Sequence, residues 1–164
     1  MSSLLLLGAG GHAKVIAEAA LASGLFCNLA FLDDRWNSSD LPPLICGFPV
    51  IGPLSTAFDP AVRKCFPFAA LAMGNSTLRL QWFDQLHSQG FQFPVIIHPS
   101  AWVSPSAKVG PGSVVFAQSV IQSDVTIGRA VIVNTGSSID HDSSIGNYVH
   151  ICPGARLAGD VRIG

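Results

Sequence analysis

The residues best suited to chemistry lie in the second half of the chain, where His141 stands next to Asp142. Imidazole titrates near neutral pH, and a carboxylate beside it can orient the ring and stabilise its protonated form. By its place in the repeat described below, His141 is expected to face outward. We therefore expect the pair to accept a proton from an attacking group, as a general base does.

A second histidine, His150, follows nine residues after His141. Nine residues make half of one coil of the repeat, so the two imidazoles of one chain should point to different sides. They could not then hold one metal ion together. We expect no metal site, and a site shared between subunits remains the alternative.

A glycine-rich turn with the sequence GAGGHAK, starting at Gly8, gives a second candidate site. It is expected between a strand and a helix, where backbone N–H groups and the helix N-terminus can receive a phosphate. Together with Asp33 and Asp34 it loosely fits a dinucleotide fingerprint, but the domain is small for both halves of a dinucleotide. A nucleotide-linked ligand is the favoured interpretation, and a turn needed only for close helix packing is the other alternative.

The elements that position His141 belong to a six-residue repeat. Every sixth residue from Ile97 to Ile163 is aliphatic, and a small or β-branched residue follows four positions later. Such hexads are typical of a parallel β-helix, in which three hexads make one coil and residues eighteen apart stack at roughly 4.8 Å. Gly159 should thus lie one coil above His141, where its N–H could donate to the oxyanion of an acyl-transfer intermediate.

The first half is predicted to be a Rossmann-like α/β domain with a small parallel sheet. The expected strands are 4–7, 29–32, 49–51, 68–73 and 94–97, the expected helices are 12–23 and 76–88, and the rest of 35–60 is expected to be loop. The predicted domains are 1–96 and 97–164.

Composition excludes several classes of protein. Of 164 residues, 49% are apolar and 12% are charged, about half the usual charged share of roughly 25%, so the chain is not disordered. Nine basic residues stand against ten acidic ones, which argues against nucleic acid and anionic membranes as partners.

The apolar N-terminal run ends at Leu7. This run is too short for a signal peptide or a membrane span, so we expect a cytoplasmic protein. The four cysteines lack disulfide or zinc spacing and are expected to be buried free thiols.

These motifs together resemble the sialic acid O-acyltransferase-like sugar acetyltransferases, which include bacterial N-acetyltransferases of nucleotide-linked 4-amino sugars. The resemblance covers the whole chain and is carried by GAGGHAK, FLDD, Gly74-Asn75 with Arg79, NTG, IDHD and HICPGARLAGDVRIG. It implies a left-handed β-helix, a homotrimer, and acetyl-CoA bound in the groove between neighbouring helices, in an enzyme of surface glycan biosynthesis.

The resemblance also implies roles for single residues. His141 would be the base that deprotonates the sugar amine, with Asp142 as the adjacent acid, and Asn134 would contact the sugar or position the base. His150 would lie near the pantetheine and thioester, and Gly159 would supply the oxyanion N–H. The nucleotide sugar would be held by Gly10, Gly11, His12, Asp33, Asp34, Gly74 and Asn75. No Ser or Cys stands beside His141 as an activated nucleophile, which suits direct attack of the amine.

Members of the resembled family continue for further coils beyond the equivalent of Gly164. Residues 97–164 hold fewer than four coils of three hexads, so we expect a β-helix that is truncated, with an exposed upper edge. The function expected is acetyl-CoA-dependent N-acetylation of a UDP- or GDP-linked 4-amino sugar. Sugar O-acetylation of the sialic acid type, and a non-catalytic relative that binds sugar nucleotides, remain the alternatives.

Overall fold

The computed structural model describes residues 2–164 and divides into two compact units, 1–94 and 95–164. The division lies two residues before the boundary expected from the sequence. It falls there because Ile96 and Ile97 already form a strand of the second unit, paired with Val114 and Val115. The expectation that 94–97 completes the sheet of the first unit is therefore wrong.

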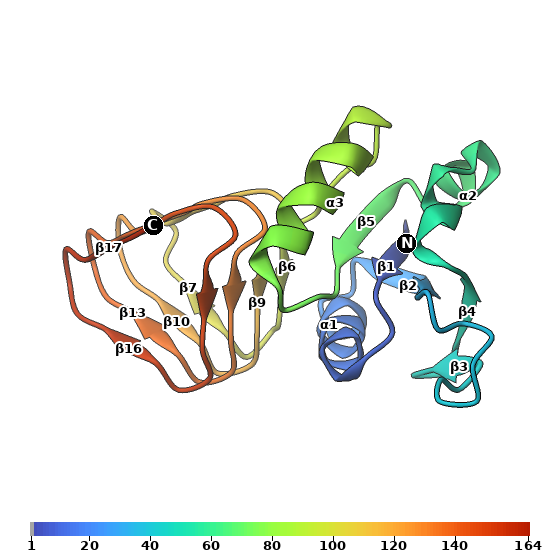
Figure 1. Ribbon diagram of the computed structural model, residues 1–164. Helices are drawn as coiled ribbons and strands as arrows, with labels where there is room; N and C mark the ends of the chain where they lie inside the picture. The colour runs from blue at the N-terminus through green and yellow to red at the C-terminus, as the bar shows by residue number, and fades with distance from the viewer. Residues whose placement is uncertain (1) are drawn as a thin grey trace. The chain divides into compact units, whose positions relative to one another are not determined.

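The first unit contains a five-stranded sheet in the order β3-β4-β2-β1-β5 (Figure 1). Its strands are β1 (Ser2–Leu7), β2 (Phe26–Leu32), β3 (Leu44–Ile45), β4 (Phe48–Gly52) and β5 (Phe68–Leu71). Neighbouring strands are parallel except for the edge pair of β3 and β4. The last four residues of β1, all leucine, are fully buried, as suits a strand inside a parallel sheet. The Rossmann-like sheet predicted from the sequence is confirmed, with one antiparallel strand added.

The helices of the first unit include two short ones that the sequence did not reveal. The helices are α1 (Gly11–Ala22), the 3₁₀ helix η1 (Leu54–Phe58), α2 (Pro60–Cys65) and α3 (Ser76–Ser88). Prolines suggested a loop over 35–60, but Pro53 precedes η1 and Pro60 begins α2, a position where a missing N–H is harmless. The Asp59 carboxylate caps α2 by accepting from the Ala61 N–H at 2.8 Å.

After β4, the chain passes to the opposite edge of β1, where it forms β5. Strands β2 and β4 lie on one side of β1, and β5 lies on the other. Gly8, which directly follows β1, has a φ of +107°, and a Cβ atom there would lie 2.8 Å from the carbonyl oxygen of Ala72, just after β5. Only glycine permits the loops this approach. In parallel sheets, such a crossing point commonly forms a ligand crevice at the carboxyl ends of the strands.

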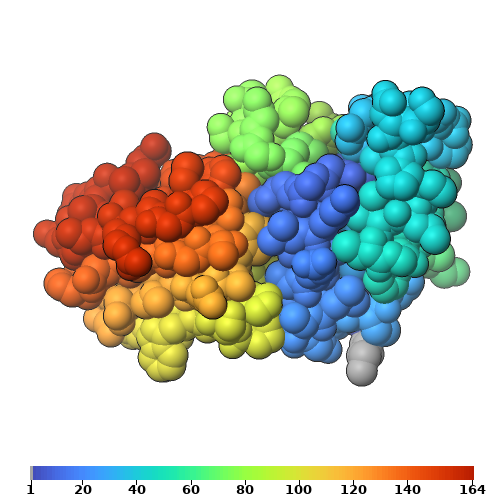
Figure 2. Space-filling view, turned by 90° about the horizontal axis from the view of Figure 1, so that it is seen from below, coloured from blue at the N-terminus to red at the C-terminus, as the bar shows by residue number. Residues whose placement is uncertain are grey.

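The second unit consists of three parallel four-stranded sheets, each made of two-residue strands. One holds β6 (Ile96–Ile97), β9 (Val114–Val115), β12 (Ile132–Val133) and β15 (His150–Ile151); the next holds β7 (Trp102–Val103), β10 (Val120–Ile121), β13 (Ser138–Ile139) and β16 (Arg156–Leu157); the third holds β8 (Lys108–Val109), β11 (Thr126–Ile127), β14 (Ser144–Ile145) and β17 (Arg162–Ile163). Paired residues are eighteen apart, as in Ile121 and Ile139. This is the register of a parallel β-helix, and the stacked coils run from yellow to red in Figure 2.

The hexad residues have regular places in this coil. The aliphatic residue that ends each strand points inward, and those from Val115 to Ile151 form a buried core. A left-handed backbone conformation recurs at every sixth residue from Gly112 to Asp160. Asp142 occupies one of these corners with a φ of +60°, a conformation that aspartate tolerates better than most residues. The stacking predicted from the repeat is confirmed, and the hand of the coil stays a prediction.

The four cysteines are free and exposed, so the expectation of buried thiols is wrong. Cys27 lies near the start of β2, Cys46 in the turn between β3 and β4, Cys65 at the end of α2, and Cys152 directly after β15. Each is at an edge or an element end, where the chain leaves its packed region. Across residues 2–164, none of the helices combines the length and the apolar character needed to cross a membrane.

Candidate active site

His141 and Asp142 form the hydrogen-bonded pair that their adjacency suggested. The distance from His141 Nδ1 to Asp142 Oδ2 is 2.8 Å, and both side chains are 61% exposed. The backbone holds both residues in place: the His141 N–H donates to the Asp140 carboxylate at 2.9 Å, and the Asp142 N–H donates to the Ser123 carbonyl at 3.1 Å. The imidazole is therefore accessible and oriented at the same time.

The charges around His141 make its imidazole more basic. The hydrogen bond to Asp142 and then the negative charge of Asp140 raise the pKa of His141 above its ordinary value. Desolvation opposes them, and the charges of Asp142 and Asp160 add smaller increases. With the carboxylate accepting from Nδ1–H, the lone pair lies on Nε2. This is the arrangement in which a histidine takes a proton from a bound nucleophile.

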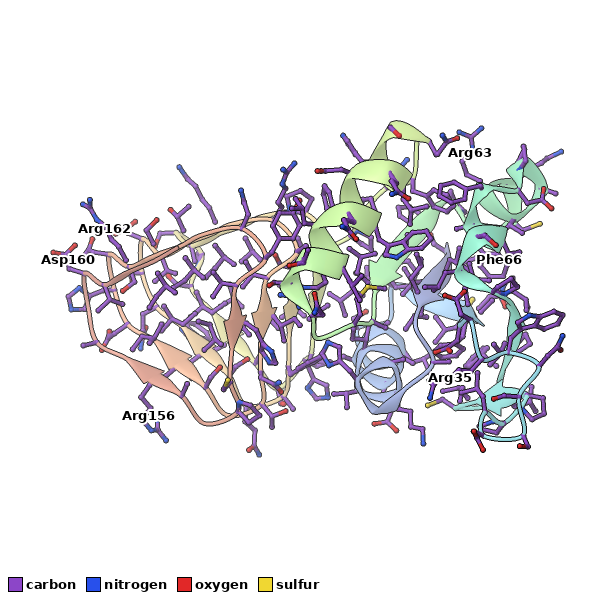
Figure 3. The ribbon with its side chains drawn as sticks, in the orientation of Figure 1. Arg35, Arg63, Phe66, Arg156, Asp160 and Arg162 are labelled. Atoms are coloured by element: carbon purple, nitrogen blue, oxygen red, sulfur yellow. The ribbon has the colours of Figure 1, made fainter. Side chains whose placement is uncertain are left out.

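Gly159 lies against the imidazole, as the eighteen-residue stacking predicts. A Cβ atom on Gly159 would be 2.6 Å from His141 Cε1 and 2.7 Å from Nε2. The next residue, Asp160, donates its N–H to the His141 carbonyl at 2.8 Å. Figure 3 shows Asp160, Arg156 and Arg162 projecting outward from this last coil. With the ring of His141 in this position, a Cβ atom at 159 does not fit unless the ring moves, a reason for glycine that the sequence did not supply.

Asn134 and His150 form a second pair, which the sequence did not reveal. Asn134 Nδ2 lies 3.0 Å from His150 Nε2, and Asn134 Oδ1 accepts from the Thr135 N–H at 2.9 Å. Because Oδ1 is already engaged, the amide nitrogen donates to Nε2, which places the His150 proton on Nδ1. Ile132 pairs with His150 in the β-helix, so this contact could have been found from the eighteen-residue register.

The two histidines belong to different sides of the coil, as expected. His150 lies on β15, in the sheet with β6, β9 and β12, whereas His141 follows β13 of the neighbouring sheet. Among residues 2–164 no group of three or more potential metal ligands gathers at one point.

The first unit has a pocket of about 510 Å³ at the carboxyl ends of its parallel strands. Gly10, Asp33 and Asp34, three of the residues predicted to hold the nucleotide sugar, line it. The other lining residues are Gly8, Arg35, Leu54, Ala72, Met73, Leu78 and Trp82. The sequence reasoning did not single out any of the apolar members of this set, because their separation along the chain hides their proximity.

Asp33 connects two segments that line this pocket, and we call its hydrogen bonds to Ala9 and Arg35 the Asp33 brace. Its carboxylate accepts from the Ala9 N–H at 2.9 Å and holds the Arg35 guanidinium through Nε at 2.9 Å and Nη2 at 3.0 Å. The hydrogen bonds from Arg35, which outweigh the effect of burial, lower the pKa of Asp33 to about 2. Asp33 thus fixes the glycine-rich turn and presents Arg35, labelled in Figure 3, at the pocket. The Asp34 carboxylate accepts from the Leu54 N–H at 2.9 Å.

The remaining expected ligand-binding residues lie beside the pocket and are not among its lining residues. Gly11 and His12 begin α1, and the Asn75 side chain caps α3 by accepting from the Leu78 N–H at 3.0 Å. The Gly74 carbonyl accepts from the guanidinium of buried Arg79. In this structure, Gly11 and His12 belong to α1, and Gly74 and Asn75 directly precede α3.

Comparison with known proteins identifies the family of the first unit. Residues 3–86 match the family described as the PglD N-terminal domain. The chain belongs to that family. It is 29% identical over 135 residues to GDP-perosamine N-acetyltransferase of Escherichia coli O157:H7, and 35% identical over 119 residues to UDP-N-acetylbacillosamine N-acetyltransferase of Bacillus subtilis. These matches cover 82% and 71% of this chain, and the chain spans only 58% and 52% of the two relatives.

Solved structures resemble the whole chain. The acetyltransferase domain of PglB from Neisseria gonorrhoeae is 43% identical with a TM-score of 0.92, over all of this chain and 77% of that one. The same domain has been solved with acetyl coenzyme A. PerB from Caulobacter crescentus, solved with CoA and GDP-perosamine, is 35% identical with a TM-score of 0.87, over 99% of this chain and 74% of that one.

Proposed function

We propose that this chain catalyses acetyl transfer from acetyl-CoA to the amino group of a nucleotide-linked 4-amino sugar. The observation that carries the proposal is the exposed His141 imidazole, held through Nδ1 by Asp142 at 2.8 Å so that Nε2 can accept a proton. N-acetyltransferases of GDP- and UDP-linked amino sugars among the relatives support this substrate class.

The proposed reaction is one direct transfer. As the neutral sugar amine attacks the thioester carbonyl carbon, His141 Nε2 takes a proton from the amine nitrogen, and Asp142 stabilises the imidazolium. The Gly159 N–H donates to the carbonyl oxygen as negative charge develops on it. When the carbon–sulfur bond breaks, the imidazolium returns the proton to the CoA sulfur, which leaves the amide and a free thiol.

We place the acceptor and the donor in different parts of the molecule. The pocket lined by Gly10, Asp33 and Arg35 takes the nucleotide, since it lies beside the glycine-rich turn at the carboxyl ends of the parallel strands. His150, with the Asn134 amide donating to its Nε2, lies along the thioester end of acetyl-CoA. Because His141 and His150 lie on different sides of one coil, we propose a homotrimer in which neighbouring chains bring them together around acetyl-CoA.

The test is acetyl transfer assayed with acetyl-CoA and either GDP-perosamine or a UDP-linked 4-amino sugar, followed by thiol release. The wild-type chain should release CoA thiol with at least one acceptor. His141→Ala should lower kcat by about 10²- to 10⁴-fold, with the melting temperature unchanged because the ring is exposed. Turnover that survives this substitution would refute the assignment of His141 as the base. Thiol release without an amine acceptor would refute the proposed acetyl transfer to an amine.

A further inference from the structure

The pocket of the first unit has a mixed lining. Glycine backbone and the charged side chains of Asp33, Asp34 and Arg35 contribute to it, together with the apolar residues Leu54, Ala72, Met73, Leu78 and Trp82. A nucleoside diphosphate likewise combines polar groups with a flat base, and Trp82 is the aromatic side chain of this lining.

Trp82 offers the pocket a flat aromatic surface. It lies four residues after Leu78 on α3, so the two side chains share one face of that helix. Arg79 and Leu86, three residues before Trp82 and four after it, are buried and adjoin the same side of the helix. The half-buried Trp82 thus stands where the core side of α3 meets the pocket.

Phe58 packs against the indole ring of Trp82. The two rings are stacked, with centroids 5.7 Å apart and an interplanar angle of 24°. Phe58 is the last residue of η1, and the first residue, Leu54, is tied to Asp34 by its N–H at 2.9 Å. The short helix η1 is thus fixed at both ends, and it holds the indole in place before a ligand arrives.

We propose that Trp82 is the residue that stacks on the nucleobase of the sugar nucleotide. The assignment rests on the proposed function for the identity of the ligand. Aromatic stacking holds a base of either kind, because every base has a π face. Trp82 therefore determines affinity for the nucleotide and leaves the chemical step at His141 unaffected.

The experiment measures binding of UDP, GDP and inorganic pyrophosphate to the full chain by calorimetry. Trp82→Leu should weaken UDP and GDP by about tenfold or more, whereas pyrophosphate, which has no base, should bind as it does to wild type. Trp82→Phe keeps an aromatic ring and should stay within a few-fold of wild type. Trp102→Leu removes an exposed indole from the second unit and is the matched control, with no change expected.

Three binding results would overturn the inference. They are wild-type affinity of Trp82→Leu for both nucleotides, an equal loss of pyrophosphate affinity, and no binding of either nucleotide to wild type. Acetyl transfer is measured separately: nucleotide binding that depends on Trp82 in a chain without transferase activity would refute the proposed function alone. Transferase activity that depends on His141 while Trp82→Leu keeps its KM would refute the inference alone.

Discussion

Replacement of Asp33 by asparagine tests the brace that shapes the nucleotide pocket. The carboxylate accepts from the Ala9 N–H and from three N–H groups of Arg35, one of them the backbone N–H at 3.0 Å. An asparagine amide has one oxygen in place of two, so its NH₂ group would face a donor. The glycine-rich turn and Arg35 would both lose a partner.

The magnitude follows from the hydrogen bonds of Arg35, which lower the pKa of Asp33 from an ordinary value near 4 to about 2. A shift of about two pKa units corresponds to roughly 2 to 3 kcal/mol. The Arg35 side chain is 55% exposed, and solvent screening reduces this to about 1 to 2 kcal/mol. Asp33→Asn should lower the free energy of unfolding of the first unit by that amount at pH 7.

The assay is urea unfolding followed by tryptophan fluorescence in a Trp102→Phe background, where the remaining tryptophans, Trp36 and Trp82, both lie in the first unit. A depressed carboxylate pKa stabilises the fold above the unfolded-state value, and the effect is lost as the pH falls. The difference between wild type and Asp33→Asn should be complete at pH 6 and shrink between about pH 4 and pH 2.

Asp34→Asn is the matched control for this measurement, because an amide oxygen can accept the single hydrogen bond from Leu54 that Asp34 receives. It should change the free energy of unfolding by less than about 0.5 kcal/mol. The stabilising role of Asp33 would be refuted if Asp33→Asn and Asp34→Asn had the same free energy of unfolding. It would also be refuted if the difference between their free energies of unfolding were the same at pH 6 and pH 3.

Two substitutions test the geometry around the base. Asp142→Asn keeps a residue suited to the left-handed corner but removes the carboxylate that raises the pKa of His141. The value of kcat should fall about tenfold or more, and the acidic limb of the pH profile of kcat should move to lower pH. An acidic limb that stays in place would contradict this. Gly159→Ala places a Cβ atom 2.6 Å from His141 Cε1, so the exposed ring must turn away from Asp142. Its kcat should fall about a hundredfold at an unchanged melting temperature, and wild-type kcat would show that the ring position is not needed.

The repeat made the second unit readable from the sequence alone. A hexad pattern without insertions fixes the register, so Gly159 could be placed over His141 by counting eighteen residues, and a Cβ distance of 2.6 Å agrees with that placement. The same count would have brought Asn134 close to His150, because Ile132 pairs with His150. In a stacked coil, sequence separation determines spatial neighbours, and this is why these residues could be predicted.

The first unit offered no such rule. The sequence identified the glycine-rich turn and Asp33 as ligand-binding candidates, but the bonds that tie Asp33 to Ala9 and Arg35 turn it into a brace. The apolar wall at Trp82 was not foreseen, because it depends on how η1 and α3 pack. Pro53, which precedes η1, and Pro60, which begins α2, were interpreted as loop residues, because the residue type alone does not show whether a proline lies in a loop or at the start of a helix.

The amino-acid sequence by itself determined the two-part architecture, the α/β class of the first unit, the coil of the second and the outward pair of His141 and Asp142. These features follow from periodicity and from neighbours along the chain. Only the tertiary structure decided which groups donate hydrogen bonds to the Asp33 carboxylate and which residues line a pocket together with the glycine-rich turn, Trp82 among them. Those contacts join strand ends and helices that are distant in sequence, and their geometry is set by packing rather than by any local pattern.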